Sequence, residues 1–496
     1  MKVLFLLSPV RELPQVLELA IPTLVGNLGP HEGVMLDLYY SDKPVFKAVR
    51  EAVETVRPQI IALGGMSCQF SVTRRIAEFL RTNYPSILLV AGGWHVSGCL
   101  ADGLENPGSF LPFDVLIYGE GEHRLREVCD LVAAGDRDFS KVPGIAFRQG
   151  ETFQRTAERG LQELSTLAVP SRQAYYKEGG QRFFKRRAYF IHCVETTRGC
   201  LYNCSFCCSP AIYGSKLRTF PIERTLADLT QLRELGARHI LFTDENMTND
   251  LEHFQKLWLE IEQARVHQMH FALYTSTRQL VRHPEIIDVL ERFGIIPLIG
   301  IESFTKAKLA YFNKQWISGD TNLEALELLR KRRVYPLVSF ILGSPEDQVD
   351  DLRLPFRTLA SIDLNVMISP AVLTPFPGTR LRKQVLEEGL VEDLEYDHYN
   401  GITPVLRTRY LSRKEVSRLR NEELVRYYFR PRYLKNLARE VWRRRLPLVL
   451  IQFLQMFTPI YYLNSDFSVR LDRRWLRLLL KLIRTPTKRI DQVSWK

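Results

Sequence analysis

Three cysteines within eight residues constrain this 496-residue chain more than any other feature of its sequence. Cys200, Cys204 and Cys207 are spaced CxxxCxxC and follow a strand-like run that ends at Thr197. Thiolates this close together converge on one inorganic centre. A four-iron cluster usually takes four cysteines, so three leave one iron open to a substrate or cofactor. The adjacent Cys208 is expected to point away from that centre.

A structural zinc knuckle is the alternative interpretation of this motif. Zinc sites usually combine a CxxC pair with a second CxxC or HxxxH pair, and no second pair lies near this one. The eight cysteines show no disulfide-framework pattern, which indicates a reducing compartment. The apolar N-terminal run lacks a signal-peptide cleavage site. We therefore expect an iron–sulfur protein of the cytoplasm.

The first third of the chain, residues 1–135, alternates strand-like and helix-like runs, which predicts a doubly wound parallel sheet. The predicted strands are residues 3–7, 34–40, 60–65, 87–93 and 115–119, and the predicted helices are residues 45–56 and 72–80. Ligands of such sheets bind beyond the carboxyl ends of the strands, where glycine permits close backbone approach. Three strands end in such turns, Gly64-Gly-Met-Ser67, Gly92-Gly-Trp-His95 and Gly119-Glu-Gly-Glu122.

The mixed, polar composition of residues 136–190 indicates a linker with short strands, and the βα pattern returns over residues 191–400. The predicted strands are residues 191–196, 239–243, 270–274, 295–301, 337–342 and 365–373. The predicted helices are residues 223–235, 251–263, 284–292, 322–330 and 347–360. Six βα units indicate a partial barrel with its active site at the C-terminal ends of the strands. Polar residues follow several of these strands, among them Asp244, Glu245, Arg278, Glu302 and Ser303.

The cysteine motif resembles the signature of the radical S-adenosylmethionine (SAM) superfamily. This resemblance implies that the three cysteines hold a four-iron cluster and that Phe206 packs near the adenine of SAM. Gly300-Ile-Glu-Ser303 and the turn within Leu373–Leu381 look like two further signatures of the family. By the same resemblance Glu302 would contact the ribose or amino group of SAM and Arg278 its carboxylate. The other strand-end residues, Asp244, Glu245 and Ser303, would complete the SAM-binding rim.

The three glycine turns resemble the cobalamin-binding domain that precedes some radical SAM domains. The residues expected to contact cobalamin are Gly64, Met66, Ser67, Gly92, Gly93, His95, Gly119, Glu120 and Gly121. The DxHxxG motif of methionine-synthase-like domains is absent. Met66 to Phe70 is therefore expected to face the lower side of the corrin, and His95 either orders its loop or ligates cobalt. A flavodoxin-like domain that has lost its ligand is the alternative.

The last region, residues 401–496, predicts basic helices. From Arg407 to Lys496 there are 23 Lys and Arg against 7 Asp and Glu, so this tail carries +16 and the preceding residues carry −4 of the total of +12. The apolar run 446–463 contains prolines and glutamines and is a poor membrane-spanning helix. With the amphipathic segment 475–484 it suits peripheral contact with an anionic membrane, or else a solvated helical cap. No nucleic-acid-binding motif accompanies the charge.

The combined pattern is typical of an α/β protein that resembles cobalamin-binding, class B type radical SAM enzymes. The stretch Tyr427–Tyr433 resembles tetrapyrrole-cyclase-like and hopanoid-related members. The resemblance implies an anaerobic enzyme that uses a 4Fe-4S cluster, SAM and cobalamin to C-methylate an unactivated carbon of a hydrophobic small molecule. An electron donor such as ferredoxin or flavodoxin is the implied partner. Radical cyclisation of a lipid or tetrapyrrole, and a non-catalytic cobalamin or redox sensor, are the alternatives.

Overall fold

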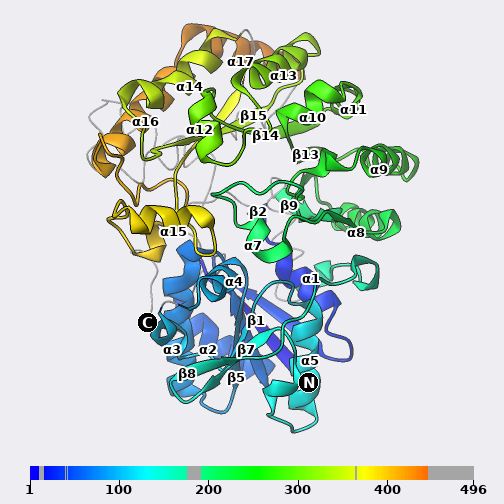
Figure 1. The fold of residues 1–496 in the computed structure, drawn as a ribbon. Helices are drawn as coiled ribbons and strands as arrows, with labels where there is room; N and C mark the ends of the chain where they lie inside the picture. The colour runs from blue at the N-terminus through cyan, green and yellow to red at the C-terminus, as the bar shows by residue number, and fades with distance from the viewer. Residues whose placement is uncertain are drawn as a thin grey trace.

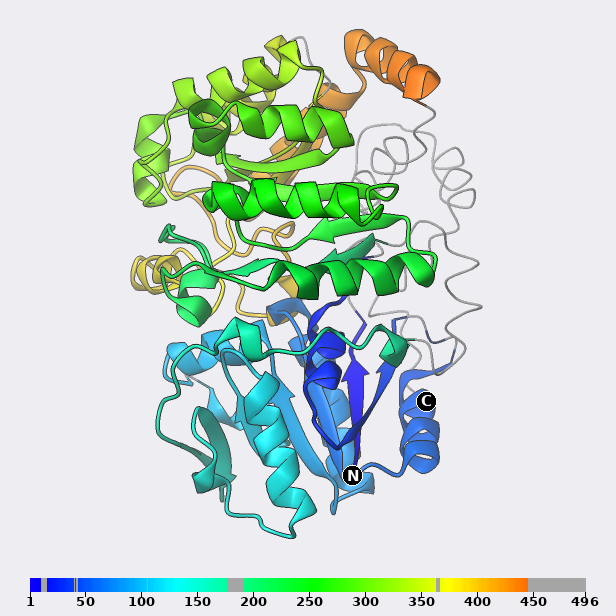
Figure 2. The same ribbon diagram turned by 90° about the vertical axis from the view of Figure 1, so that its right-hand side faces the viewer.

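The chain folds into two lobes, which lie one above the other in Figures 1 and 2. The computed structural model describes residues 1–9, 16–39, 41, 43–104, 106–175, 191–362 and 366–444. The lower lobe contains the glycine turns, and the upper lobe contains the cysteine motif. The apolar run 446–463 and the basic segment 475–484 lie outside the described residues.

A seven-stranded sheet with the order β3-β1-β4-β5-β6-β7-β8 forms the centre of the lower lobe. Its strands are β1 (Lys2–Leu7), β3 (Glu32–Asp37), β4 (Ile60–Gly64), β5 (Leu88–Gly92), β6 (Val115–Ile117), β7 (Ile145–Gln149) and β8 (Thr152–Arg155). The first five are parallel, and β7 and β8 pair antiparallel. The two antiparallel strands come from the segment expected to be a linker, so this segment extends the sheet.

Helices cover both faces of the lower sheet, which explains why its parallel strands read as unbroken apolar runs. They are α1 (Ala20–Gly26), α2 (Val45–Val56), α3 (Phe70–Asn83), α4 (Trp94–Ala101) and α5 (Glu122–Ala133). In α2 the buried residues recur at helical spacing, namely Val45, Ala48, Val49, Ala52, Val53 and Val56. The predicted doubly wound fold is therefore confirmed.

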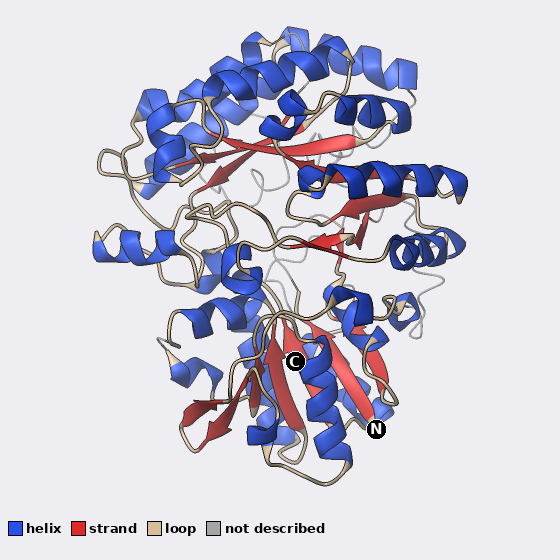
Figure 3. Ribbon diagram, turned by 45° about the vertical axis from the view of Figure 1, so that its right-hand side comes forward, coloured by secondary structure: helices blue, strands red, loops and turns tan. Residues whose placement is uncertain are grey.

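The upper lobe is a curved, all-parallel sheet with the order β16-β15-β14-β13-β12-β9-β2. Its strands are β2 (Val16–Leu17), β9 (Ile191–Val194), β12 (His239–Phe242), β13 (His270–Thr275), β14 (Ile296–Glu302), β15 (Leu337–Leu342) and β16 (Met367–Val372). The helices are α8 (Ile222–Glu234), α9 (Leu251–Gln263), α10 (Thr277–Arg282), α11 (Glu285–Phe293), α12 (Lys306–Tyr311), α13 (Gly319–Lys331), α14 (Val349–Ser361) and α15 (Arg380–Glu387). Figure 3 shows helices along the outer side of this sheet, and the predicted partial barrel is confirmed.

The barrel sheet has one strand that the βα pattern did not predict. β2 lies far ahead of the barrel in the sequence, yet it pairs parallel with β9 through Val16 and Leu17. Two residues are too short to give a periodic signal. The pairing covers the edge of β9, which would otherwise present open backbone groups to solvent.

Helix α16 (Arg413–Tyr428) covers the other edge of the barrel and leads into α17 (Pro431–Arg444). The Tyr428 hydroxyl donates to the carbonyl of Ile368 in β16 and accepts from the amide of the same residue. Tyr427 donates to the carbonyl of Val366 just before that strand. The described part of the C-terminal region is helical, as predicted. In the described residues, no helix has the length and apolarity needed to cross a membrane.

Candidate active site

The cysteine loop leaves the barrel after β9, passes through β10 (Thr197–Arg198) and ends at α7 (Ser209–Tyr213). β10 pairs antiparallel with β11 (Arg218–Thr219), so the loop is closed at its base. Gly199 at this base has φ of +90°, and a Cβ there would overlap the carbonyl oxygen of Lys216. Only glycine fits this position, which turns the chain so that Cys200 begins the motif.

The three predicted ligands are half-buried. Burial raises the pKa of Cys200, and it raises the pKa of Cys204 and of Cys207 to about 12; the pKa of each of these two is raised further by charge on the other cysteines. Asn249 donates to the sulfur of Cys200 over 3.9 Å. Since metals bind thiolates, loading of this loop releases protons.

The donor set fits an iron–sulfur cluster, because each of three thiolates can ligate a different iron. A structural zinc ion usually takes four ligands in a tetrahedral arrangement. Cys208, at the start of α7, lies near Asp102 of the lower lobe, and burial raises its pKa to about 12.

Asp244 and Glu245, predicted to lie on the SAM-binding rim, support the cysteine loop. Asp244 accepts from the Thr196 backbone amide at 3.1 Å and from the Thr196 and Thr197 hydroxyls at 2.8 and 2.7 Å. Glu245 accepts from the Gly199 amide at 2.9 Å. Burial raises the pKa of Asp244 to about 6 and that of Glu245 to about 7. Both carboxylates thus fix the residues that lead into Cys200.

Glu302 lies at an irregular strand end. The register between β14 and β15 shifts between Gly300 and Glu302, and Glu302 has φ of +56°, a left-handed conformation that costs free energy outside glycine. Its carboxylate pairs with Lys314 Nζ at 2.8 Å, and Lys314 also donates to the Gly300 carbonyl at 2.8 Å. A Cβ at Gly300 would overlap this carboxylate. Lys314, which sequence reasoning missed, therefore orients Glu302.

The other predicted SAM contacts surround the cysteine loop in different ways. Phe206 is partly buried and meets the Phe312 ring edge-on at 5.2 Å. Ser303 accepts from the Thr305 amide at 3.0 Å and so orders the turn before α12. Arg278 lies half-exposed in the first turn of α10, close enough to the loop to lower the pKa of Tyr202, which burial raises.

Two glycine turns of the lower lobe contact each other at the carboxyl edge of its sheet. A Cβ at Gly64 would lie 2.8 Å from the Gly92 carbonyl oxygen, and Gly93 has φ of +94° and faces the Gly65 backbone. A small hollow opens beside them, with Met66, Phe70 and His95 in its wall. Met66 is 37% exposed. The glycines of the two turns present bare backbone, which suits the close approach of a flat cofactor such as cobalamin.

His95 lies in the wall of this hollow and is buried. Its Nδ1 lies 3.1 Å from the Ser67 hydroxyl, and Cys99 sulfur lies 3.5 Å from Nε2. The ring packs on Phe70 at 4.1 Å and on Tyr396 at 4.5 Å between centroids. Burial lowers the pKa of His95 to about 3, so the ring is neutral. With both nitrogens engaged, the geometry favours the loop-ordering role over cobalt ligation.

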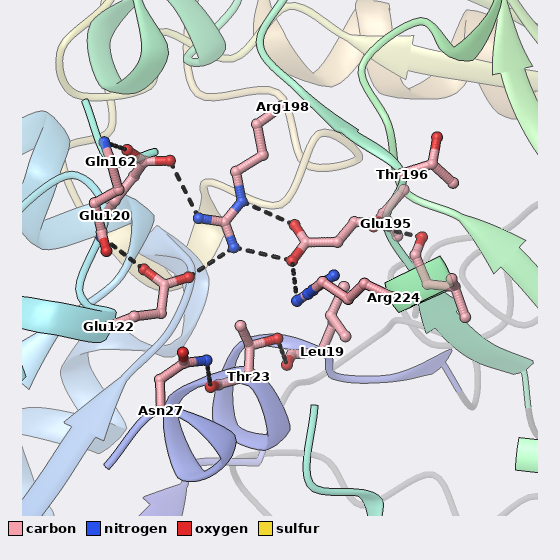
Figure 4. A network of polar contacts seen from close by, with 12 residues as sticks. Leu19, Thr23, Asn27, Glu120, Glu122, Gln162, Glu195, Thr196, Arg198 and Arg224 are labelled. Carbon is pink, nitrogen blue, oxygen red and sulfur yellow. Dashed lines mark hydrogen bonds and ion pairs between the residues drawn. The ribbon is translucent and has the colours of Figure 1, made fainter. Parts of the chain in front are cut away.

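The third glycine turn faces the cysteine loop. Gly119 has φ of +66°, and Gly121 precedes α5. The Glu120 carboxylate accepts from Arg198 at 3.1 Å and from the Gln162 amide at 2.7 Å (Figure 4). It also accepts from Arg218 at 2.9 Å. A carboxylate with these partners has little capacity left for a cofactor. Glu120, predicted as a cobalamin contact, therefore lies where the two lobes meet.

The proline-rich turn after β16 also joins the lobes. Pro377 and Gly378 pack against Gly98 of α4, where a Cβ would lie 2.7 Å from the Pro377 carbonyl carbon. The Gly378 amide donates to Asp102 at 2.8 Å. This turn was expected only as part of the binding rim. Its glycine and proline allow two backbones to touch, a contact that single-strand periodicity does not predict.

These features define a partial barrel with an iron–sulfur loop beside a glycine-turn cofactor lobe. Residues 194–354 match the Radical SAM superfamily, so the chain contains a radical SAM domain and the predicted resemblance is confirmed. Its homologues are radical SAM methyltransferases and cyclases, which supports an enzyme of this kind.

Three curated relatives illustrate this relationship. An uncharacterized methyltransferase of Pyrococcus horikoshii is 23% identical over 88% of this chain and 94% of its own length. The anaerobic magnesium-protoporphyrin IX monomethyl ester cyclase of Cereibacter sphaeroides is 24% identical over 76% of this chain and 60% of its own length. The cobalamin-dependent radical SAM methyltransferase TokK of Streptomyces tokunonensis is 31% identical, over 43% of this chain and 32% of its own length.

A solved structure shares the two-lobed fold. The cobalamin-dependent SAM radical enzyme OxsB, with aqua-cobalamin and SAM bound, superposes with a TM-score of 0.66 at 16% identity, over 97% of this chain and 75% of that one. At this identity the likeness concerns the fold.

Proposed function

We propose that this protein is a cobalamin-dependent radical SAM enzyme that C-methylates an unactivated carbon of a hydrophobic small molecule. The observation that carries the proposal is the loop of three half-buried cysteines that follows Arg198, whose guanidinium contacts Glu120 in the third glycine turn of the lower lobe. When bound, the cluster supplies an electron, SAM the 5′-deoxyadenosyl radical and cobalamin a methyl group.

The protein's own residues would bind and orient the cofactors and exclude water from them. Cys200, Cys204 and Cys207 would hold the cluster, and Asp244 and Glu245 fix the chain that leads into it. Glu302, Ser303, Arg278 and Phe206 would bind SAM, with the Glu302 carboxylate oriented by Lys314. The glycine turns around Gly64 and Gly93 would cradle cobalamin, with Met66 and Ser67 at its lower side and His95 ordering the turn.

Metal loading tests the cluster assignment. After anaerobic reconstitution with iron and sulfide, the full chain should show iron–sulfur absorbance and cleave SAM to 5′-deoxyadenosine under a strong reductant. Cys200→Ala, Cys204→Ala and Cys207→Ala should each abolish both signals. Cys208→Ala is the matched control and should retain them, because we expect that thiol, which lies near Asp102, not to hold the cluster. Zinc in place of iron would contradict the proposal.

Methylation and cyclisation use the same first radical and differ in the fate of the methyl group. The cyclase of Cereibacter sphaeroides favours cyclisation, whereas TokK and the Pyrococcus horikoshii relative favour methylation. SAM labelled in its methyl group separates them, since an unlabelled product formed in good yield rules out methylation. A cobalamin or redox sensor would bind the cofactors but leave SAM intact.

The substrate class and the partners belong to the same proposal. A hydrophobic substrate, an isoprenoid lipid or a tetrapyrrole, suits the basic C-terminal region and agrees with the tetrapyrrole named for the cyclase relative. Access to it would come through peripheral contact with the inner face of the membrane. A ferredoxin or flavodoxin would supply the electron. Reduction of the reconstituted protein by either carrier, followed by absorbance at the cluster band, tests that partner.

A further inference from the structure

An ion cluster joins the cysteine loop to the third glycine turn (Figure 4). Arg198 lies two residues before Cys200, and its guanidinium contacts three carboxylates. These are Glu120 at 3.1 Å and Glu122 at 2.6 Å from the lower lobe, and Glu195 at 2.9 Å from its own loop. The side chains of Arg198, Glu120 and Glu122 are 8, 2 and 6% exposed. One buried cation thus bridges both lobes.

The surrounding groups complete the cluster. Arg218 pairs with Glu120 at 2.9 Å and donates to the Gln162 carbonyl. Gln162 donates its backbone amide to Glu120 and its side-chain amide to Glu122. Arg224 lies 3.6 Å from Glu195 and stacks over the Phe220 ring. Three guanidinium groups therefore balance three carboxylates. A buried charge is tolerated where it is paired and hydrogen-bonded in this way.

The position of this cluster gives it a role beyond stability. The loop side carries Gly199 and Cys200, and the lobe side carries Gly119 and Gly121. Separating the partners of a buried pair leaves an uncompensated charge. The cluster therefore has one favourable arrangement and resists displacement of one lobe against the other. Any displacement of the lower lobe along the barrel would break bonds to Glu120 and Glu122 together.

We propose that Arg198 is a positioning residue that fixes the separation of the cluster-binding loop and the cobalamin-binding turns. This inference rests on the proposed function for the identity of the two cofactors, but not for the mechanical link between the turns. The link holds two redox groups in register although they are bound by separate lobes. Methyl transfer between lobes requires such a register, since small misplacements of reacting groups cost much of the rate.

Hydrogen exchange of the full chain tests the link without any cofactor. In Arg198→Gln, amides of residues 119–122 and 199–204 should exchange together, at least roughly tenfold faster than in the parent protein, because buried charges lose their partner. Arg420→Gln is the matched control, since Arg420 is equally buried but donates to the Ile402 carbonyl of the C-terminal region. That control should leave both turns unchanged, and Arg198→Lys should restore part of the protection.

Electron paramagnetic resonance of the holoenzyme tests the register. The reduced cluster and cob(II)alamin each carry an unpaired electron, and their spin–spin interaction should weaken or broaden in Arg198→Gln and recover in part in Arg198→Lys. Arg198→Gln could lose protection throughout both sheets. In that case Glu122→Gln, which removes one of the three carboxylates that contact Arg198, should still open both turns. Unchanged exchange in both turns, or opening of only one, would overturn the proposal. A holoenzyme without cobalamin would instead contradict the proposed function, while the exchange result would stand.

Discussion

At the residue scale, His95 shows how burial changes a side chain that sequence reasoning treats as a ligand. Its ring is enclosed by Phe70 and Tyr396 and hydrogen-bonded to Ser67. Burial lowers its pKa from 6.5 to about 3. Below pH 6.5 the unfolded chain therefore binds a proton at His95 that the folded chain does not bind. The contribution of His95 to the free energy of unfolding is fully present above that pH and is lost as the pH falls towards 3.

Replacement of His95 by phenylalanine should remove this pH dependence. The free energy of unfolding of the parent protein, measured by urea denaturation from pH 7 to pH 4, should fall more steeply than that of His95→Phe, by about 1.4 kcal/mol per pH unit for one group. Phenylalanine keeps the aromatic contacts but loses the hydrogen bond to Ser67. The loss of this bond lowers the free energy of unfolding at neutral pH as well. Parallel curves below pH 6 would contradict the assignment.

The Glu302–Lys314 pair carries a second prediction at this scale. Their side chains are 9 and 7% exposed, so Lys314→Met leaves a buried carboxylate without its cation. We expect the free energy of unfolding to fall by about 3–5 kcal/mol in urea denaturation.

Two controls separate charge loss from lysine loss. Adding Glu302→Gln should recover most of the stability, because the double variant has no uncompensated charge. Lys141→Met removes a lysine from the exposed pair with Asp136 and should change little, since exposed pairs contribute little. Equal effects at both lysines would be inconsistent with a special role for the buried pair.

At the element scale, helix α4 depends on a glycine for its contact with the turn at Pro377–Gly378. Alanine normally favours a helix over glycine by about 1 kcal/mol. At Gly98 a Cβ would overlap the Pro377 carbonyl, so Gly98→Ala should instead destabilise the protein by about 1–3 kcal/mol. Gly160→Ala is the control, because a Cβ there meets nothing within 4 Å. Thermal melting of both variants measures the difference, and a stabilised Gly98→Ala would refute the contact.

Most helices and strands and the cysteine loop were predictable from the sequence. The distant residues to which their side chains hydrogen-bond were not. Apolar periodicity located the barrel strands and α9 (Leu251–Gln263) because each buries one face. The motif spacing located Cys200, Cys204 and Cys207. The bonds of Asp244 and Glu120 depend on residues 48 and 78 positions away, Thr196 and Arg198, and such distances leave no local pattern. The one signal for the ion cluster was the arginine directly before Gly199-Cys200.

At the scale of the whole molecule, charge is divided along the chain. The body carries −4 and the C-terminal region from Arg407 carries +16, so attraction to an anionic surface would come from that region. We expect the full chain to float with vesicles containing anionic phospholipid at low salt, where each basic residue near the headgroups contributes about 1 kcal/mol. Binding should weaken at high salt and be lost on neutral vesicles. A protein that ignores anionic vesicles at low salt would make a soluble substrate the better hypothesis.

The pairing of β2 with β9 makes the two lobes inseparable by a single cut. β1 lies in the lower sheet, β2 contributes Val16 and Leu17 to the barrel, and β3 lies in the lower sheet again. A gene fragment that starts at the barrel therefore encodes a sheet whose β9 edge is bare, and bare edges pair with other chains. Dissection into modules, or exchange of the cofactor lobe between homologues, must carry residues 1–17 with the lobe and re-create this strand. The two lobes must therefore be transferred together, although each is expected to bind a different cofactor.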